Sequence, residues 1–225
     1  MDGPQIPGGR LHTAQCLSVI AHYAGQDDRE QMRVDPIIIG TFPCSHHVMS
    51  KASNTFALSI HDAENLLKHF NTLNTQPPPP EIEVLKRAGL IMAMIAWETY
   101  VEDRVQEVAE QRLSALTDSS ISAFVKGKLD EEIKRLHNPT SDKTIQLFRD
   151  YAGIDLTAKW SWNNFEPKLV RERLNQYMKL RGDVVHRSRV SNGDTSTAHP
   201  VKKEDLERAI NFLKELVRAT ESAFI

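Results

Sequence analysis

The chain has 225 residues, which is enough for one domain with a substantial hydrophobic core plus an extension. Its composition is ordinary, with 40% hydrophobic and 26% charged residues, and its formal net charge of −2 argues against a protein that coats nucleic acid non-specifically. The two cysteines, Cys16 and Cys44, are too few for a disulfide framework at this length, which favours a reducing environment. The N-terminus has no apolar signal-peptide core, and the apolar run at 88–97 is too short to cross a bilayer. We therefore expect a soluble cytoplasmic protein with no membrane partner.

Residues 1–52 show no regular pattern, and we interpret them as an N-terminal extension of unknown role that precedes a folded domain at 53–225. Cys44, His46 and His47 lie close together near the end of this extension, but they lack the paired spacing of a metal site. We predict no metal and no cofactor.

The regular pattern begins with a helix that Asn54 is expected to cap and that ends near Asn74. A stiff polyproline connector at 76–80 follows, and the longest helix extends from 81 to about 113. Its segment 88–97 is apolar on nearly every side, so we expect this segment to be buried throughout, at the centre of a bundle.

Two shorter helices come next. The first opens at Thr117-Asp118, and the second is capped by Ser141 and closed by Gly153. A link with Trp160 and Trp162 follows, and we expect these indoles to pack the end of the bundle rather than to stack on nucleic-acid bases. The predicted apolar stripe of the first helix consists of Ile121, Phe124, Val125, Leu129, Ile133 and Leu136.

The last two helices complete the pattern. One begins at Pro167 and extends to about Arg189, and the other follows Pro200. Their apolar stripes are Val170, Leu174, Tyr177, Met178 and Val185 in the first, and Leu206, Ile210, Leu213, Leu216, Val217 and Phe224 in the second. Because every regular segment has the 3.6-residue period, the sequence predicts an all-α, up-and-down helical bundle with an N-terminal extension.

Arg181 and His186, in the helix that begins at Pro167, are the candidate catalytic residues. Their spacing resembles the R-x(4–6)-H signature of HEPN domains, many of which are metal-independent endoribonucleases. The chemistry that this resemblance implies, cleavage of RNA without a metal, requires a base for the 2′-hydroxyl, an acid for the 5′-oxygen and positive charge on the phosphate. Histidine suits the first two roles because its pKa is ~6.5, and the planar fork of arginine suits the third. A solvated surface pair and a histidine near a helix end are the alternative interpretation.

The spacing of this pair poses a geometric problem, because five positions on a straight helix place two side chains about 140° apart. Either Gly182 loosens the helix between them, or two copies of the motif meet across a two-fold axis. The surrounding stretch, residues 166–190, has seven Lys/Arg against three Asp/Glu, a balance of +4, which suits a phosphate-facing surface. Its candidate RNA-binding residues are Lys179, Arg187 and Arg189.

Two sequence phrases resemble a known family. Leu180-Arg181-Gly-Asp-Val-Val-His186 resembles the R-x(4–6)-H signature of HEPN domains, which are small all-α domains, many of them metal-independent endoribonucleases. Ala96-Trp97-Glu98-Thr-Tyr-Val-Glu-Asp103 resembles the corresponding helix of the RiboL-PSP-type HEPN subfamily. The resemblance covers roughly residues 53–225.

This resemblance implies an endoribonuclease with a composite Arg/His site in the cleft of a homodimer, and RNA as the substrate. It also implies a setting in toxin–antitoxin or antiviral defence systems, with an antitoxin or another neutralising protein as a partner. Glu98 follows a buried run, where a carboxylate needs a cationic partner, and Arg181 is the candidate. The alternative is a surface Glu98 with no particular partner.

One departure from the family pattern stands directly after the motif arginine. Many members have Asn, Asp or His there, whereas this chain has Gly182, and Asp183 is the residue that can replace the missing polar group. If it does not, the chain fits a non-catalytic HEPN module for RNA binding or protein assembly.

Overall fold

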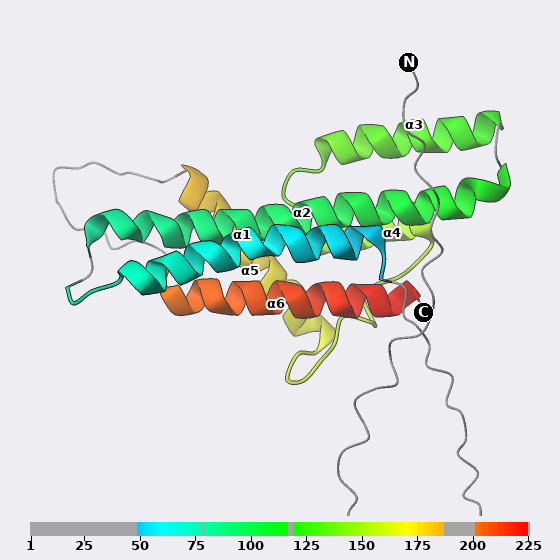
Figure 1. Ribbon diagram of the computed structural model, residues 1–225. Coiled ribbons are helices and arrows are strands. Elements are labelled where there is room, and N and C mark those ends of the chain that lie inside the picture. The colour runs from blue at the N-terminus through cyan, green and yellow to red at the C-terminus, as the bar shows by residue number, and fades with distance from the viewer. Residues whose placement is uncertain (1–48, 78, 117–118, 187–200, 225) are drawn as a thin grey trace, which may run out of the picture. The chain divides into compact units, whose positions relative to one another are not determined.

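The computed structural model of this chain describes residues 49–225 except 78, 117–118, 187–200 and 225 (Figure 1). Most of the predicted extension and the predicted helix start at Thr117-Asp118 lie outside the described residues. The division of the chain at residue 52 therefore stays a prediction.

Six α-helices and three short 3-10 turns make up the part of the chain that the structure describes. The α-helices are α1 (Lys51–Leu73), α2 (Glu83–Leu113), α3 (Ser120–Arg135), α4 (Ser141–Ala152), α5 (Pro167–His186) and α6 (Lys203–Glu221). The 3-10 turns are η1 (Pro80–Ile82), η2 (Ser114–Leu116) and η3 (Ser222–Phe224). Within these residues there is no strand, and the prediction of an all-α bundle is confirmed.

The long helix α2 is the centre of the bundle, as predicted. It packs along α1 and also contacts α3, α4, α5 and α6, and Figure 1 shows α1 and α6 running beside it. Its buried face includes Leu90, Met94, Trp97 and Tyr100. A Cβ added at Gly89 would lie 2.8 Å from Leu206 Cδ2, so any other residue here would force the Leu206 side chain to shift where α2 meets α6.

The expectation that segment 88–97 is buried throughout is wrong at one position. Ile95 is 39% exposed, and Ile91 and Met92 are only partly buried. The helices that pack on α2 leave this side of it open. Three exposed or half-buried apolar side chains therefore lie along one edge of the central helix, close in sequence to Glu98.

The predicted buried stripe of the third helix is also partly wrong. Leu129 and Leu136 are buried, but Ile121 and Phe124 are exposed, Phe124 to 66%. Figure 1 shows α3 lying against the second half of α2, away from α1 and α6, so only part of its apolar face finds a partner.

Two local details of the helices differ from the sequence-based expectation. Helix α1 is capped by Ser50 rather than Asn54, because Ser50 Oγ accepts a hydrogen bond from Ser53 N at 2.9 Å. In α5 it is Val184, not Val185, that is buried, and Val185 is 50% exposed.

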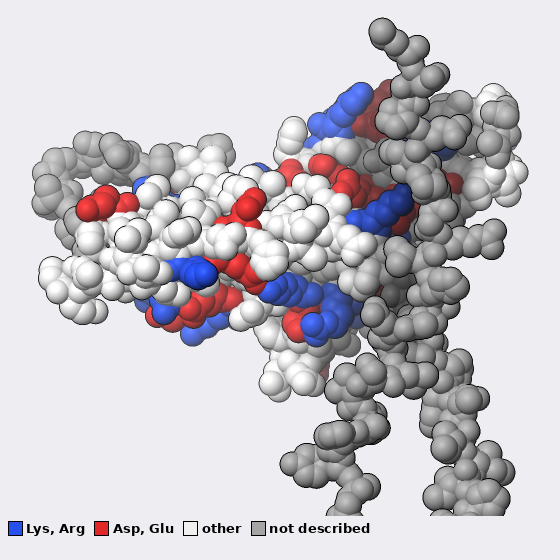
Figure 2. All heavy atoms as spheres, in the orientation of Figure 1, with Lys and Arg blue, Asp and Glu red and all other residues white. Residues whose placement is uncertain are grey.

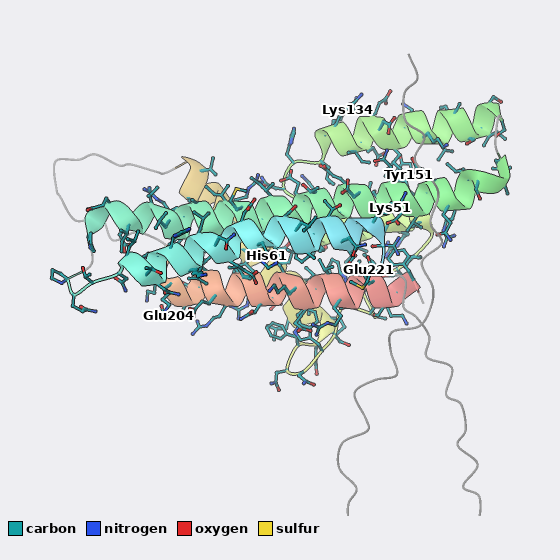
Figure 3. The ribbon with its side chains drawn as sticks, in the orientation of Figure 1. Lys51, His61, Lys134, Tyr151, Glu204 and Glu221 are labelled. Carbon is teal, nitrogen blue, oxygen red and sulfur yellow. The ribbon has the colours of Figure 1, made fainter. Side chains whose placement is uncertain are left out.

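A buried polar cluster joins α1, α2 and α6, and nothing in the sequence pattern indicated it. Glu221 Oε1 accepts hydrogen bonds from Ser50 Oγ at 2.9 Å and from Tyr100 Oη at 2.8 Å, and it lies 2.9 Å from Arg104 Nε. Burial and the neighbouring Glu221 carboxylate raise the pKa of Tyr100 well above its ordinary value. Figure 3 shows Glu221 at the C-terminal end of α6, near Lys51 at the start of α1.

Candidate active site

Arg181 of α5 is held by two side chains from different parts of the fold. Its Nη2 lies 3.3 Å from Oε2 of Glu98 on α2, and its Nη1 donates a hydrogen bond to Oδ1 of Asn138 in the loop between α3 and α4. The side chains of Arg181 and Glu98 are mostly buried, at 20% and 16% exposure. The expected approach of Glu98 to Arg181 is therefore observed, whereas the catalytic roles of both residues stay predictions.

Asn138 was not among the predicted site residues. It follows Leu136 at the end of α3 and has a φ of 57°, in the left-handed region that asparagine tolerates better than most residues. The next residue, Pro139, fixes the loop to the core, because its carbonyl accepts hydrogen bonds from Trp97 Nε1 at 3.2 Å and from Thr144 Oγ1 at 3.4 Å. The sequence Asn-Pro indicated a helix stop but not a side chain aimed at Arg181.

Asn175 ties α5 to the other end of the same loop. Its Oδ1 accepts a hydrogen bond from Ser141 N at 2.9 Å, and its Nδ2 donates to Ser141 Oγ at 3.0 Å. The predicted cap of α4 at Ser141 is thus replaced by Thr140 at the N-cap position, with the amide satisfied by a side chain from α5. As a result, the loop that presents Asn138 is anchored to both α2 and α5.

His186 is the last residue of α5, and the helix is continuous through Gly182. The Cα positions of Arg181 and His186 are therefore about 140° apart around the helix axis, as the spacing indicates. A helix that loosens at Gly182 is not observed, so the hypothesis of two motifs meeting across a two-fold axis is the one that remains open.

A shallow pocket of about 540 Å³ lies beside the Arg181–Asn138 contact. Its lining includes Asn138, Thr140, Asn175, Lys179, Gly182 and Asp183. The predicted RNA-binding residue Lys179 is exposed, the predicted supporting residue Asp183 is partly buried, and both lie on this pocket. Arg187 and Arg189, the other predicted RNA-binding residues, lie outside the described residues.

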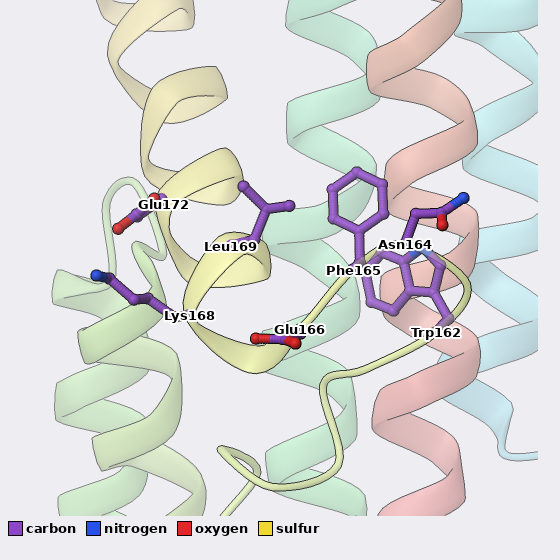
Figure 4. A pocket seen from close by; sticks show the side chains of 7 residues that line it. All are labelled: Trp162, Asn164, Phe165, Glu166, Lys168, Leu169 and Glu172. Carbon is purple, nitrogen blue, oxygen red and sulfur yellow. The ribbon is translucent and has the colours of Figure 1, made fainter.

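The two indoles before α5 have mainly structural roles. Trp160 is buried and its Nε1 donates to Thr220 Oγ1 at 3.0 Å, which confirms the prediction of core packing. Trp162 is half-buried and stacks on Phe165 with ring centroids 5.1 Å apart. Figure 4 shows these two rings beside a pocket that Glu166 and Glu172 also line, with Lys168 as its one basic residue. Two carboxylates against one ammonium make it a poor site for an RNA phosphate.

Between 49 and 225, leaving aside the undescribed positions, no three His, Cys, Asp or Glu side chains are placed to hold a metal ion. No helix of that part of the chain is both long enough and apolar enough to cross a membrane. On the face shown in Figure 2, acidic and basic side chains are interspersed over α1, α2 and α6 without a broad basic patch.

An all-α bundle whose helix carries an R-x4-H motif is the arrangement of an HEPN domain. The family profile RiboL-PSP-HEPN matches residues 58–225, and the chain belongs to this family. Membership implies a function connected with RNA, because HEPN domains are often ribonucleases. No curated protein and no solved structure matches the chain.

Proposed function

We propose that this protein is a metal-independent endoribonuclease that cleaves RNA through Arg181 and His186 in the cleft of a homodimer. The observation that carries this proposal is the fixed guanidinium of Arg181, held by Glu98 and Asn138 from two separate elements. An arginine fixed by two partners at a partly buried position is prepared to bind a phosphate without reorganisation. Five N–H donors on one guanidinium leave several for a ligand after these two contacts.

The proposed reaction is a transfer within the RNA strand. His186 takes the proton of the 2′-hydroxyl, the 2′-oxygen attacks the adjacent phosphorus, and the bond from phosphorus to the 5′-oxygen breaks. The leaving 5′-oxygen is then protonated by the same His186, which became an imidazolium when it took the 2′-proton. Arg181 stabilises the charge that develops on the phosphate oxygens. The products are a 2′,3′-cyclic phosphate and a free 5′-hydroxyl, and DNA is spared because it has no 2′-hydroxyl.

Exposed apolar side chains beside Arg181 support a dimer at this place. Ile95 precedes Glu98 by three positions on α2, and Val185 follows Arg181 by four positions on α5, so each lies on the same helix face as a member of the ion pair. Both are exposed in one copy of the chain. Burying them against a second copy would bring two Arg/His motifs around one cleft.

The basic residues Lys179, Arg187 and Arg189 would hold the phosphates on either side of the scissile one. In this proposal the protein acts in the cytoplasm as a toxin or an antiviral defence effector. A neutralising antitoxin is then the expected protein partner.

A non-catalytic HEPN module for RNA binding or assembly is the second candidate, and Gly182 is the observation that favours it. The residue directly after the motif arginine has no side chain to contribute, so Asp183 would have to supply the polar group from the pocket that it lines. The two candidates differ in a single outcome, namely whether His186 is needed for RNA cleavage.

Mixing two inactive variants tests the composite site. We expect Arg181→Ala and His186→Ala to be inactive alone, and an unfolded and refolded equimolar mixture to recover about a quarter of wild-type activity, since half the dimers are mixed and each has one intact site. No recovery, with mixed dimers shown to form, would contradict a site shared between two chains. The control is each variant unfolded and refolded alone at the same total protein concentration.

A further inference from the structure

The pocket beside Arg181 is not explained by the catalytic pair. It has a volume of about 540 Å³ and lies between the start of α4 and the last turns of α5. Neither Arg181 nor Glu98 lines it, but Asn138 both lines it and binds Arg181. Asn138 therefore lies between a group bound in this pocket and the guanidinium of Arg181.

Glycine at position 182 keeps part of the pocket wall free of side chain. Packing explains the glycine at position 89, because a Cβ there would lie 2.8 Å from Leu206. Among the residues that the structure describes, packing does not explain Gly182, since a Cβ there would meet none of their atoms within 4 Å. A helical glycine costs about 1 kcal/mol relative to alanine. Its benefit at this place is that a ligand can approach the bare backbone of α5.

The remaining walls combine apolar and polar groups. Met178 is buried and contributes apolar surface, whereas Lys179, Asp183 and Thr140 supply an ammonium, a carboxylate and a hydroxyl. A phosphate alone would meet the carboxylate of Asp183 unfavourably. A nucleobase, which has apolar faces and an edge of donors and acceptors, matches this mixture.

We propose that this pocket holds the base of the nucleotide next to the phosphate bound by Arg181. It would hold that base against the backbone at Gly182, with Lys179, Asp183 and Thr140 reading its edge. The inference rests on the proposed function for the identity of the phosphate. It adds a base-recognition site to the cleavage site, so that cleavage depends on the base at one position.

Substituting Gly182 by leucine tests the pocket, and Gly127 provides a matched control. Gly127 lies in the middle of α3, and a Cβ there also meets no atom of the described part of the chain within 4 Å. Both Gly182→Leu and Gly127→Leu should raise the unfolding temperature, because leucine favours helix over glycine. A loss of function in Gly182→Leu therefore cannot be attributed to loss of the fold.

Binding is measured by fluorescence anisotropy with a short single-stranded RNA whose 2′-O-methyl groups prevent cleavage. We expect Gly182→Leu to bind this RNA roughly tenfold more weakly than wild type, and Gly127→Leu to bind like wild type. Replacing one nucleotide at a time by an abasic residue should reveal one position at which loss of the base also weakens wild-type binding roughly tenfold. Gly182→Leu should be insensitive to the loss of that base.

Equal binding by Gly182→Leu and Gly127→Leu would overturn the inference, and so would wild-type protein that does not bind the RNA. The inference is also overturned if Gly182→Leu lowers the affinity for the abasic RNA as much as the affinity for the intact RNA. The leucine would then obstruct the sugar-phosphate backbone of the RNA and not the base. The endoribonuclease proposal fails in a different experiment, namely if His186→Ala cleaves unmodified RNA as fast as wild type does.

Discussion

Removing the carboxylate of Glu98 should separate catalysis from stability more clearly than any other single change. Glu98→Ala leaves Arg181 with Asn138 as its partner among the described residues, so the guanidinium loses its charged support from α2. We expect kcat/KM for RNA cleavage to fall while the bundle remains folded. Glu98→Gln keeps an acceptor oxygen in the same place and should therefore recover part of the lost kcat/KM. If Glu98 had a purely structural role, cleavage per folded molecule would be the same in Glu98→Ala, Glu98→Gln and wild type.

The size of the effect follows from the geometry of the pair. At 3.3 Å the Coulomb energy of two unit charges is about 5 kcal/mol at an effective dielectric constant of about 20, before desolvation. Both side chains keep some exposure, at 20% and 16%, so solvent screens part of this energy. Hydrogen bonds to charged groups have a net value of about 1.5–3 kcal/mol. A loss of that size in the transition state corresponds to roughly a 10- to 150-fold lower kcat/KM.

The assay is cleavage of an RNA with a single cut site, with urea denaturation of each variant in parallel. Glu102→Ala is the matched control, because Glu102 lies one turn further along α2 and is also partly buried. Glu102→Ala should cleave at a rate close to wild type. If Glu98→Ala cleaves as fast as Glu102→Ala, or if its loss is matched by unfolding alone, the idea that Glu98 orients Arg181 is refuted.

Three further outcomes follow from the same structure. Arg181→Lys should lose nearly all cleavage, since a single ammonium cannot bind Asn138, Glu98 and a phosphate with separate nitrogens, and a cleavage assay on folded variant checks this. Burial and the nearby Glu98 raise the pKa of Glu102, so the ionised form of Glu102 destabilises the fold. Glu102→Gln should therefore raise the unfolding free energy at pH 7. Urea titrations should show that this gain vanishes below the ordinary pKa of 4.5, where Glu102 is neutral in the folded and the unfolded chain. Glu221→Gln should lower the unfolding free energy by about 1.5–3 kcal/mol in urea, because Arg104 loses its 2.9 Å ion pair with Glu221 and keeps only the 3.4 Å contact with Glu107, while cleavage per folded molecule should not change.

The helices and the central position of α2 could be predicted because they depend on local pattern. The 3.6-residue period, the proline at the start of α5 and the glycine at the end of α4 are all visible in the chain itself. The exposure of Ile95 and Phe124 could not be predicted, since an apolar stripe does not show whether a neighbour covers it. The burial of Val184 rather than Val185 depends on how α5 is rotated, which its partners determine.

The candidate site was predictable only in part for a similar reason. The contact between Arg181 and Glu98 was expected because Glu98 follows a buried apolar run, where a carboxylate needs a cationic partner. Asn138 was not expected, because its role depends on a left-handed backbone and on a loop that Trp97 and Asn175 anchor from distant helices. Long-range contacts of polar side chains leave no periodic signal in a single sequence.

The most direct test of the proposed chemistry is cleavage of a defined RNA in excess EDTA by wild type and by His186→Ala. We expect wild type to cleave without divalent metal and to leave 2′,3′-cyclic phosphate ends. We also expect His186→Ala, folded to the same extent, to be slower by about 10²–10⁴-fold. Cleavage that EDTA abolishes and Mg²⁺ restores, or cleavage that His186→Ala carries out undiminished, would contradict metal-independent catalysis by His186.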